Sequence, residues 1–134
     1  MIVSKYLVYT LKTDREHILK TWETRAQEDI SQAFDSPLLI KPQLDSFLAI
    51  LEEALEEEDK DMTIKKVLDY LDQIKVKTKP RYHSLDQIVC EYDLFQEVLI
   101  ETLSHSLPLK SSESDLLHTV IQEAAQSSSL NRRH

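Results

Sequence analysis

Apolar residues recur at helical spacing along almost the whole chain, and no stretch alternates with a period of two over the length of a strand. Spacing of three and four residues places apolar side chains on one face of an α-helix, where they can be buried together. The sequence therefore predicts an all-α fold, a bundle of five or six helices. Its 134 residues are the length of one domain.

The predicted helices are separated by proline, which removes an amide donor and constrains the residue before it. The segments that carry the pattern are residues 13–30, 42–55, 61–78, 84–107 and 112–124, preceded by a short helix or N-terminal arm at residues 6–11. Pro37 and Pro42 bound one connection, and Pro80 and Pro108 end two of the helices.

Three helix starts are marked by hydroxyl side chains. Thr13 with Glu16, and Ser84 with Gln87, have the spacing of a capping box, in which two side chains satisfy free amides at a helix N-terminus. Ser112 is expected to open the last helix.

The segment 84–107 has the clearest apolar face and is predicted to be the central helix. Tyr92, Phe95 and Leu99 from this helix, together with Trp22, are predicted to be buried in one cluster. The Tyr92 hydroxyl then needs a hydrogen-bond partner. Glu91 lies one residue off the apolar face, and we expect it to accept from a donor on a neighbouring helix.

Residues 1–126 are predicted to form one helical domain, and residues 127–134, which lack periodicity, a disordered tail. Within residues 111–126, one stripe follows the 4–3 spacing of a coiled-coil seam. The residues of this stripe are Leu117, Val120 and Ala124. They predict an output helix that takes part in a weak dimer seam. The alternative is that this helix packs back on its own bundle.

The chain contains no glycine. Phosphate-binding P-loops, dinucleotide-binding turns and nucleophile elbows depend on the backbone angles or close approach that glycine allows. We therefore do not expect sites of these classes.

The charge balance is acidic, with a net charge of −8. Such a charge opposes binding to nucleic-acid phosphates and to anionic lipid. No apolar run approaches the length of a membrane span, and the opening apolar run is too short for a signal peptide. We therefore expect a soluble cytoplasmic domain with no nucleic-acid partner and no membrane span.

Few residues suggest metal or redox chemistry. Cys90 is the single cysteine, so the chain cannot form an internal disulfide, and its place in the central helix predicts a small buried side chain. The five histidines lack metal-ligand spacing. Residues 52–61 hold seven carboxylates and no glycine, which favours a solvated helix end over a calcium loop. The basic residues from 65 to 81 predict a solvated face or, alternatively, a surface for an acidic partner segment. We expect no cofactor and no metal.

Two histidines resemble phosphoacceptors. His17 and Lys20 are similar to part of the core of histidine phosphotransfer bundles, although Thr21 and Trp22 follow the lysine, where those proteins need a small residue. His105 resembles the phosphoacceptor of a histidine-kinase box but lacks the acidic residue after it. A haem-binding globin sensor is a further alternative, with His83 and His105 as candidate ligands.

Residues 82–103, with the pattern Ser-Leu-x-x-Ile-Val-x-Glu-Tyr-x-Leu-Phe, resemble the signature helix of RsbRD-type N-terminal domains. Residues 16–22, which end in Trp22, and residues 111–125 are similar to other helices of that family. The residues that carry the signature here are Trp22, Glu91, Tyr92, Phe95 and Leu99. Gln96 stands where the family often has arginine, and residues 56–80 match nothing in it.

These domains are sensory modules of stressosome co-antagonists and of bacterial sensor histidine kinases. The resemblance implies a globin-like bundle without haem, commonly dimeric, that regulates an attached or associated output domain. Our hypothesis is a non-catalytic sensory or regulatory domain, a homodimer that passes its signal through the C-terminal helix. The alternatives are a phosphotransfer bundle using His17 and a haem-binding sensor.

Overall fold

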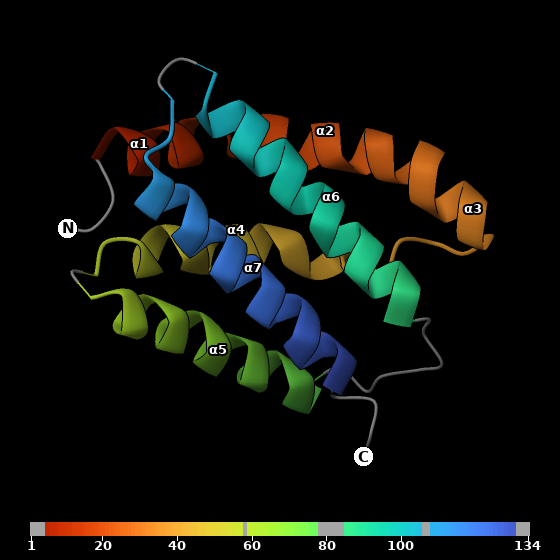
Figure 1. Ribbon diagram of the computed structural model, residues 1–134. Coiled ribbons are helices and arrows are strands. Elements are labelled where there is room, and N and C mark those ends of the chain that lie inside the picture. Colours follow the sequence, from red (N-terminus) through yellow and green to blue (C-terminus); the bar gives the residue numbers. More distant parts are fainter. Residues whose placement is uncertain (1–4, 58, 78–84, 106–107, 131–134) are drawn as a thin grey trace.

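A computed structural model of the chain describes residues 5–57, 59–77, 85–105 and 108–130, and this part is helical without strands. The helices are α1 (Lys5–Thr13), α2 (Arg15–Ala26), the π-helix η1 (Gln27–Ser31), α3 (Gln32–Phe34), α4 (Lys41–Ala54), α5 (Lys60–Lys77), α6 (Leu85–Leu103) and α7 (Ser111–Leu130). Because α2, η1 and α3 follow one another without a break, the described residues form six helical rods (Figure 1). The all-α prediction of five or six helices is confirmed.

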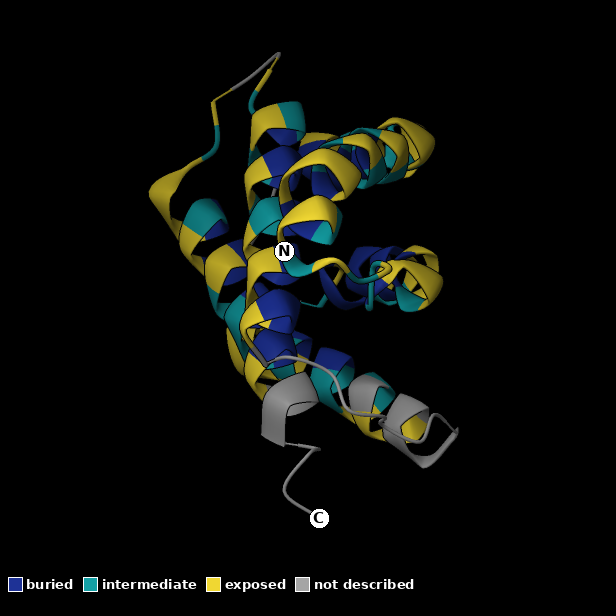
Figure 2. Cartoon of the chain, turned by 90° about the vertical axis from the view of Figure 1, so that its right-hand side faces the viewer, coloured by how far each residue is buried: buried dark blue, intermediate teal, exposed yellow. Residues whose placement is uncertain are grey.

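The longer helices pack in a closed order around one core. α6 contacts α2 on one side and α7 on the other; α7 contacts α5, α5 contacts α4, and α4 returns to α1 and α2. Figure 2 shows the buried residues on the faces that these helices turn toward one another. In the described part, no helix is both long and apolar enough to cross a membrane.

The aromatic core lies where α2, α4 and α6 meet. Trp22, Tyr92, Phe95 and Leu99 are at most 1% exposed, so the predicted cluster is confirmed. Phe47 from α4 makes edge contacts with the rings of Tyr92 and Phe95, at centroid distances of 6.3 and 5.8 Å. Edge contacts of this kind add about 0.5–1.5 kcal/mol to the gain from burial alone.

The start of α2 differs from the prediction. The Thr13 hydroxyl donates to the Tyr9 carbonyl oxygen at 3.1 Å, and Asp14 occupies the N-cap position of α2 without a side-chain capping bond. Thr13 ends α1 instead of opening α2, because a threonine in the last turn can bond back to the carbonyl four residues earlier. The capping box predicted at Ser84 lies outside the described residues, as do Pro80 and His83.

The segment that joins α2 to α4 turns at Asp35, which has a φ of 50°. This left-handed conformation is the usual helix stop, where glycine is preferred and Asp is tolerated. Since the chain has no glycine, Asp35 fills the position. α4 then begins at Lys41 with Pro42 in its first turn, close to the predicted start.

The C-terminal helix begins and ends beyond the predicted limits. The Glu113 carboxylate accepts from the Lys110 backbone N–H at 3.0 Å, which closes the first turn of α7. α7 continues to Leu130, so the helix includes residues 127–130 of the segment predicted to be a disordered tail. Residues 131–134 lie outside the described part.

The stripe on α7 faces its own bundle. Leu117, Val120 and Ala124 are 0%, 1% and 0% exposed within the single chain. These side chains pack into the core together with Leu116 and Ile121. The burial agrees with the alternative in which this helix packs on its own bundle.

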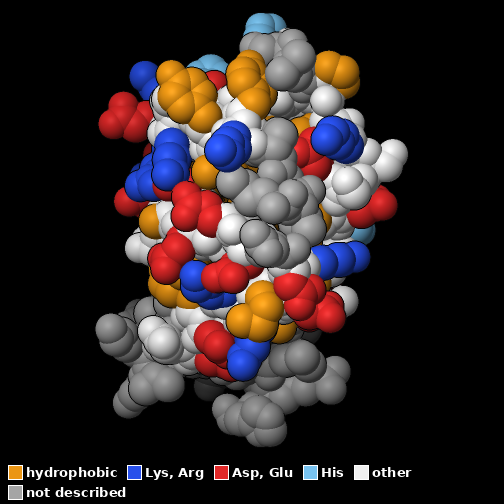
Figure 3. Space-filling model, turned by 90° about the vertical axis from the view of Figure 1, so that its left-hand side faces the viewer, with side chains coloured by type: hydrophobic (Ala, Val, Ile, Leu, Met, Phe, Trp, Pro, Cys, Tyr) orange, Lys and Arg blue, Asp and Glu red, His pale blue; other side chains and the backbone are white. Residues whose placement is uncertain are grey.

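The acidic run between α4 and α5 is only partly solvated. Glu53 and Glu56 are exposed, but Glu52 is only 7% exposed. Lys66 lies 2.9 Å from Glu57 and 3.5 Å from Glu53, and Lys12 lies 3.5 Å from Glu56. Figure 3 shows this end of the molecule, where acidic and basic side chains lie beside one another.

Candidate functional site

Glu91 is a fully buried carboxylate on α6. It is 0% exposed, and it accepts hydrogen bonds from two consecutive backbone amides of the connection before α4. Leu39 N donates to both carboxylate oxygens at 2.9 and 3.0 Å, and Ile40 N donates to one of them at 2.9 Å. Ile40 is the N-cap of α4, so the negative charge also lies at the positive end of that helix.

Gln87, one turn earlier on α6, completes the attachment. Its side-chain amide donates to Glu91 Oε2 and to the Pro37 carbonyl oxygen, both at 2.9 Å. The connection of residues 36–40 is therefore held through both its amides and a carbonyl. Gln87 is only 2% exposed, so these bonds are sheltered from water.

The same turn of α6 is fixed to two other helices. The Trp22 indole N–H of α2 donates to the Glu91 carbonyl oxygen at 3.0 Å. The Gln43 side-chain amide of α4 donates to the Tyr92 hydroxyl at 2.8 Å. We call these five residues, Trp22, Gln43, Gln87, Glu91 and Tyr92, the Glu91 cluster. It joins α2, α4, α6 and the 36–40 connection.

The prediction for Glu91 was right about its accepting role and wrong about the donor. The donors to its carboxylate are backbone amides of a connection and a side chain of its own helix. Gln43 and Gln87 were missed. The spacing of four residues between Gln87 and Glu91 is the one signal that could have found part of the cluster, because such residues are neighbours on a helix.

A second buried carboxylate is neutralised in another way. The Arg15 guanidinium donates from Nη2 to both Glu52 oxygens at 2.8 Å and from Nε at 3.2 Å. The hydrogen bond to Glu52 raises the pKa of Arg15, against the lowering effect of burial. This pair fixes the start of α2 to the end of α4 and explains why Glu52 departs from the predicted solvated helix end.

Cys90 is exposed, so its prediction as a buried side chain is wrong. α6 turns Glu91 and Tyr92 inward, and their neighbours Val89 and Cys90 therefore face outward. Partial burial raises the pKa of the Cys90 thiol, and the nearby charges of Asp93, Asp86 and Glu91 raise it further.

Two of the histidines that the sequence singled out, His17 and His105, lie at exposed positions of the described residues. His17 is exposed on α2, with Lys20 exposed one turn later and Trp22 buried in the core. His105 is exposed just after α6, and His83 lies outside the described residues. Among the described residues, no three His, Cys, Asp or Glu side chains are grouped as metal ligands would be.

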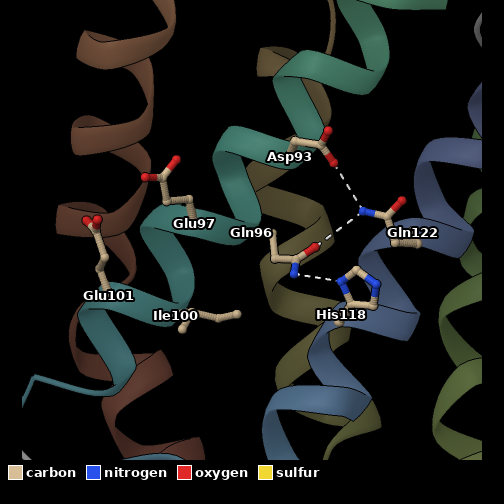
Figure 4. A pocket seen from close by; sticks show the side chains of 7 residues that line it. All are labelled: Asp93, Gln96, Glu97, Ile100, Glu101, His118 and Gln122. Atoms are coloured by element: carbon tan, nitrogen blue, oxygen red, sulfur yellow. Dashed lines mark hydrogen bonds between the residues drawn. The ribbon is translucent and has the colours of Figure 1, made fainter.

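Two grooves open on the surface of the described residues. One, of about 370 Å³, lies between α6 and α7 and is lined by Asp93, Gln96, Glu97, Ile100, Glu101, His118 and Gln122 (Figure 4). The other, of about 540 Å³, runs along α2 and η1 and is lined by Lys20, Glu23, Thr24, Gln27, Glu28, Ser31 and Gln32. His105 lines neither of them.

Comparison of the chain with family models, with curated proteins and with solved structures finds no match in any of the three.

Proposed function

We propose that this chain is a non-catalytic sensory or regulatory helical domain, similar to RsbRD-type domains, that controls an attached or associated output domain. One observation carries the proposal. Trp22 and the Glu91–Tyr92 pair, which lie 69 residues apart and belong to separate parts of the resemblance, are joined by a direct hydrogen bond. If the two segments belong to one family pattern, they are expected to pack against each other in the fold, and this hydrogen bond meets that expectation.

The Glu91 cluster suits a regulatory role because the Glu91 carboxylate depends on the backbone amides of Leu39 and Ile40 in the 36–40 connection. A buried carboxylate is costly without its donors, so release of the 36–40 connection would take two backbone donors from Glu91 and favour a repacking of α6. α6 packs along α7 over much of its length. A change in α6 therefore reaches the C-terminal helix, which carries the change to the output domain as a shift or rotation.

A chimera tests this function. The chain is fused before a dimeric histidine-kinase core, and autophosphorylation is compared among the native domain, Glu91→Gln, Tyr92→Phe and the exposed control Glu97→Gln. We expect the two cluster variants to change the rate by about fivefold or more, the size of a typical coupling between sites, and Glu97→Gln to leave it unchanged. Circular dichroism establishes that each variant is folded. Equal rates in all four folded proteins would contradict the proposal.

Phosphotransfer by His17 remains the second candidate because its imidazole is exposed beside Lys20. Incubation with a phosphorylated receiver domain tests it directly. Acid-labile, base-stable phosphate on the native chain, absent from His17→Asn, would replace the regulatory proposal by a phosphotransfer function.

The cytoplasmic location and the homodimer belong to the same proposal. Because Leu117, Val120 and Ala124 are buried within one chain, a dimer of this fold would use another surface. Sedimentation of the purified chain measures whether it self-associates.

A further inference from the structure

The groove between α6 and α7 contains a chain of hydrogen bonds that runs from a carboxylate to an imidazole (Figure 4). Gln122 Nε2 lies 3.1 Å from Asp93 Oδ1 and 3.3 Å from Gln96 Oε1. Gln96 Nε2 in turn lies 2.8 Å from His118 Nδ1. The four side chains alternate between the two helices, and none of them belongs to the Glu91 cluster.

The carboxylate fixes the direction of this chain. An ionised Asp93 can only accept, so Gln122 must turn its amide nitrogen toward it. The same nitrogen also meets Gln96, which must present its oxygen there and its own nitrogen to the imidazole. His118 Nδ1 is then required to accept, which is the neutral imidazole with its proton on Nε2.

A proton on His118 Nδ1 is incompatible with this order. Two N–H donors would face each other across 2.8 Å. Gln96 can restore the bond by rotating its amide so that its oxygen faces the imidazolium. Its nitrogen then faces Gln122, which must rotate its own amide to accept.

We propose that this groove is a proton-responsive link between α6 and α7, in which protonation of His118 reverses the Gln96 and Gln122 amides and withdraws the donor from Asp93. The other titratable groups that line the groove are Glu97 and Glu101 of α6. Glu101 is paired with Arg25 of α2 at 3.0 Å, so it is already neutralised. The consequence is local to the contact between α6 and α7, and it stands independently of the proposed function.

Nuclear magnetic resonance of the ¹⁵N-labelled chain tests the proposal, with the pH lowered from about 8 to about 5, the range in which histidine gains its proton. We expect the side-chain amide signals of Gln96 and Gln122 to shift with the same midpoint as the imidazole signals of His118. The variant Gln96→Leu removes the middle link of the hydrogen-bond series between His118 and Gln122. In this variant the pH-dependent shift of the Gln122 side-chain signal should be lost. The side chains of Gln96, His118 and Gln122 are partly or fully exposed, so Gln96→Leu is expected to fold.

Glu97→Gln is the matched control, because it removes a carboxylate from the same groove but not from the chain of hydrogen bonds. The coupled shifts should persist in it. The proposal would be overturned if, in the native protein, the side-chain signals of Gln96 or Gln122 did not shift with the pH midpoint of His118. It would also be overturned by a Gln122 shift that survives in Gln96→Leu, since the imidazolium charge would then act without the amides.

Discussion

Glu91 and Glu52 show two ways of burying a carboxylate in one small domain. Moving a charge from water into the core is costly unless donors replace the lost water. Glu52 has the guanidinium of Arg15, a charged partner in bidentate geometry. Glu91 instead uses backbone amides and a neutral side chain. An ion pair can re-form in water after opening, whereas the amides at Leu39 and Ile40 are presented together only in the folded connection.

Glu91→Gln measures what this arrangement contributes. The new side chain has one oxygen for the two backbone amides, and its nitrogen faces the Gln87 amide, which must turn away from the Pro37 carbonyl oxygen to accept. We expect the free energy of unfolding to fall by about 1.5–3 kcal/mol, the value of a hydrogen bond to a charged group. Urea denaturation measures it. Glu97→Gln, exposed on the same helix, should change stability by no more than about 0.5 kcal/mol. Equal stability of the two variants would show that Glu91 has no special role in the fold.

The thiol of Cys90 offers a pH-dependent probe. Burial, followed by the charges of Asp93, Asp86 and Glu91, raises the pKa of Cys90. A higher pKa means less thiolate at neutral pH, and the thiolate is the reactive form. Alkylation by iodoacetamide should therefore be slower in the folded chain than in urea, and its rate should continue to rise with pH above the usual thiol range.

Replacing the acidic neighbours tests the cause. Asp86→Asn combined with Asp93→Asn should speed the alkylation of Cys90 in the folded chain at neutral pH, and should leave its rate in urea unchanged. If the double variant reacts no faster than the native folded chain at neutral pH, the charges of Asp86 and Asp93 do not act on the thiol.

Asp35 stores a small backbone strain that substitution can relieve. Its left-handed conformation favours glycine. We expect Asp35→Gly to stabilise the fold by about 0.5–1 kcal/mol, measured as a higher thermal midpoint. Ala33→Gly, two residues earlier inside α3, should instead destabilise it by about 1 kcal/mol. Destabilisation by both changes would refute the strain at Asp35.

At the scale of helices, apolar spacing was sufficient to predict the positions of α4, α5 and α6, and the start of α7, to within a few residues. It predicted the burial of Phe95 and Leu99 because these lie at the middle of a broad apolar stripe. It failed at Cys90, at the edge of that stripe, where the rotation of the helix decides which neighbours face outward. The π turn of η1 and the backbone donors at Leu39 and Ile40 depend on tertiary contacts that carry no local pattern.

Leu117→Glu separates the two roles considered for α7. Leu117 is 0% exposed within the single chain, so a charge there must enter the core without a partner. We expect loss of helical circular dichroism or a thermal midpoint lowered by well over 10 °C, since a loss of several kcal/mol has this effect in a domain of this size. Gln126 is an exposed residue of α7. Gln126→Glu should therefore leave the circular dichroism and the thermal midpoint unchanged. If Leu117→Glu instead keeps its native stability and loses only self-association, the prediction that α7 forms a dimer seam would be supported.

At the scale of the whole molecule, the largest buried side chains of the described residues are unevenly distributed among the helices. The four largest fully buried side chains, Trp22, Tyr92, Phe47 and Phe95, come from α2, α4 and α6. The Glu91 cluster ties the same three helices together. Among the side chains described on α5, the buried ones are the smaller Thr63 and Val67. α5 contacts α4 and α7 but is outside this aromatic core.

Local opening requires less free energy where fewer large side chains are buried. Native-state hydrogen exchange should therefore show α5 opening below the free energy of global unfolding, while the amides of α6 near Glu91 and Tyr92 exchange only by global unfolding. Val67→Ala should speed exchange in α5 and leave the protection of α6 closer to the native value. Phe95→Ala, which costs about 3–5 kcal/mol, should lower protection throughout the chain, because its ring lies in the shared core. Protection of α5 equal to that of α6 in the native chain would mean that the six rods unfold as a single unit.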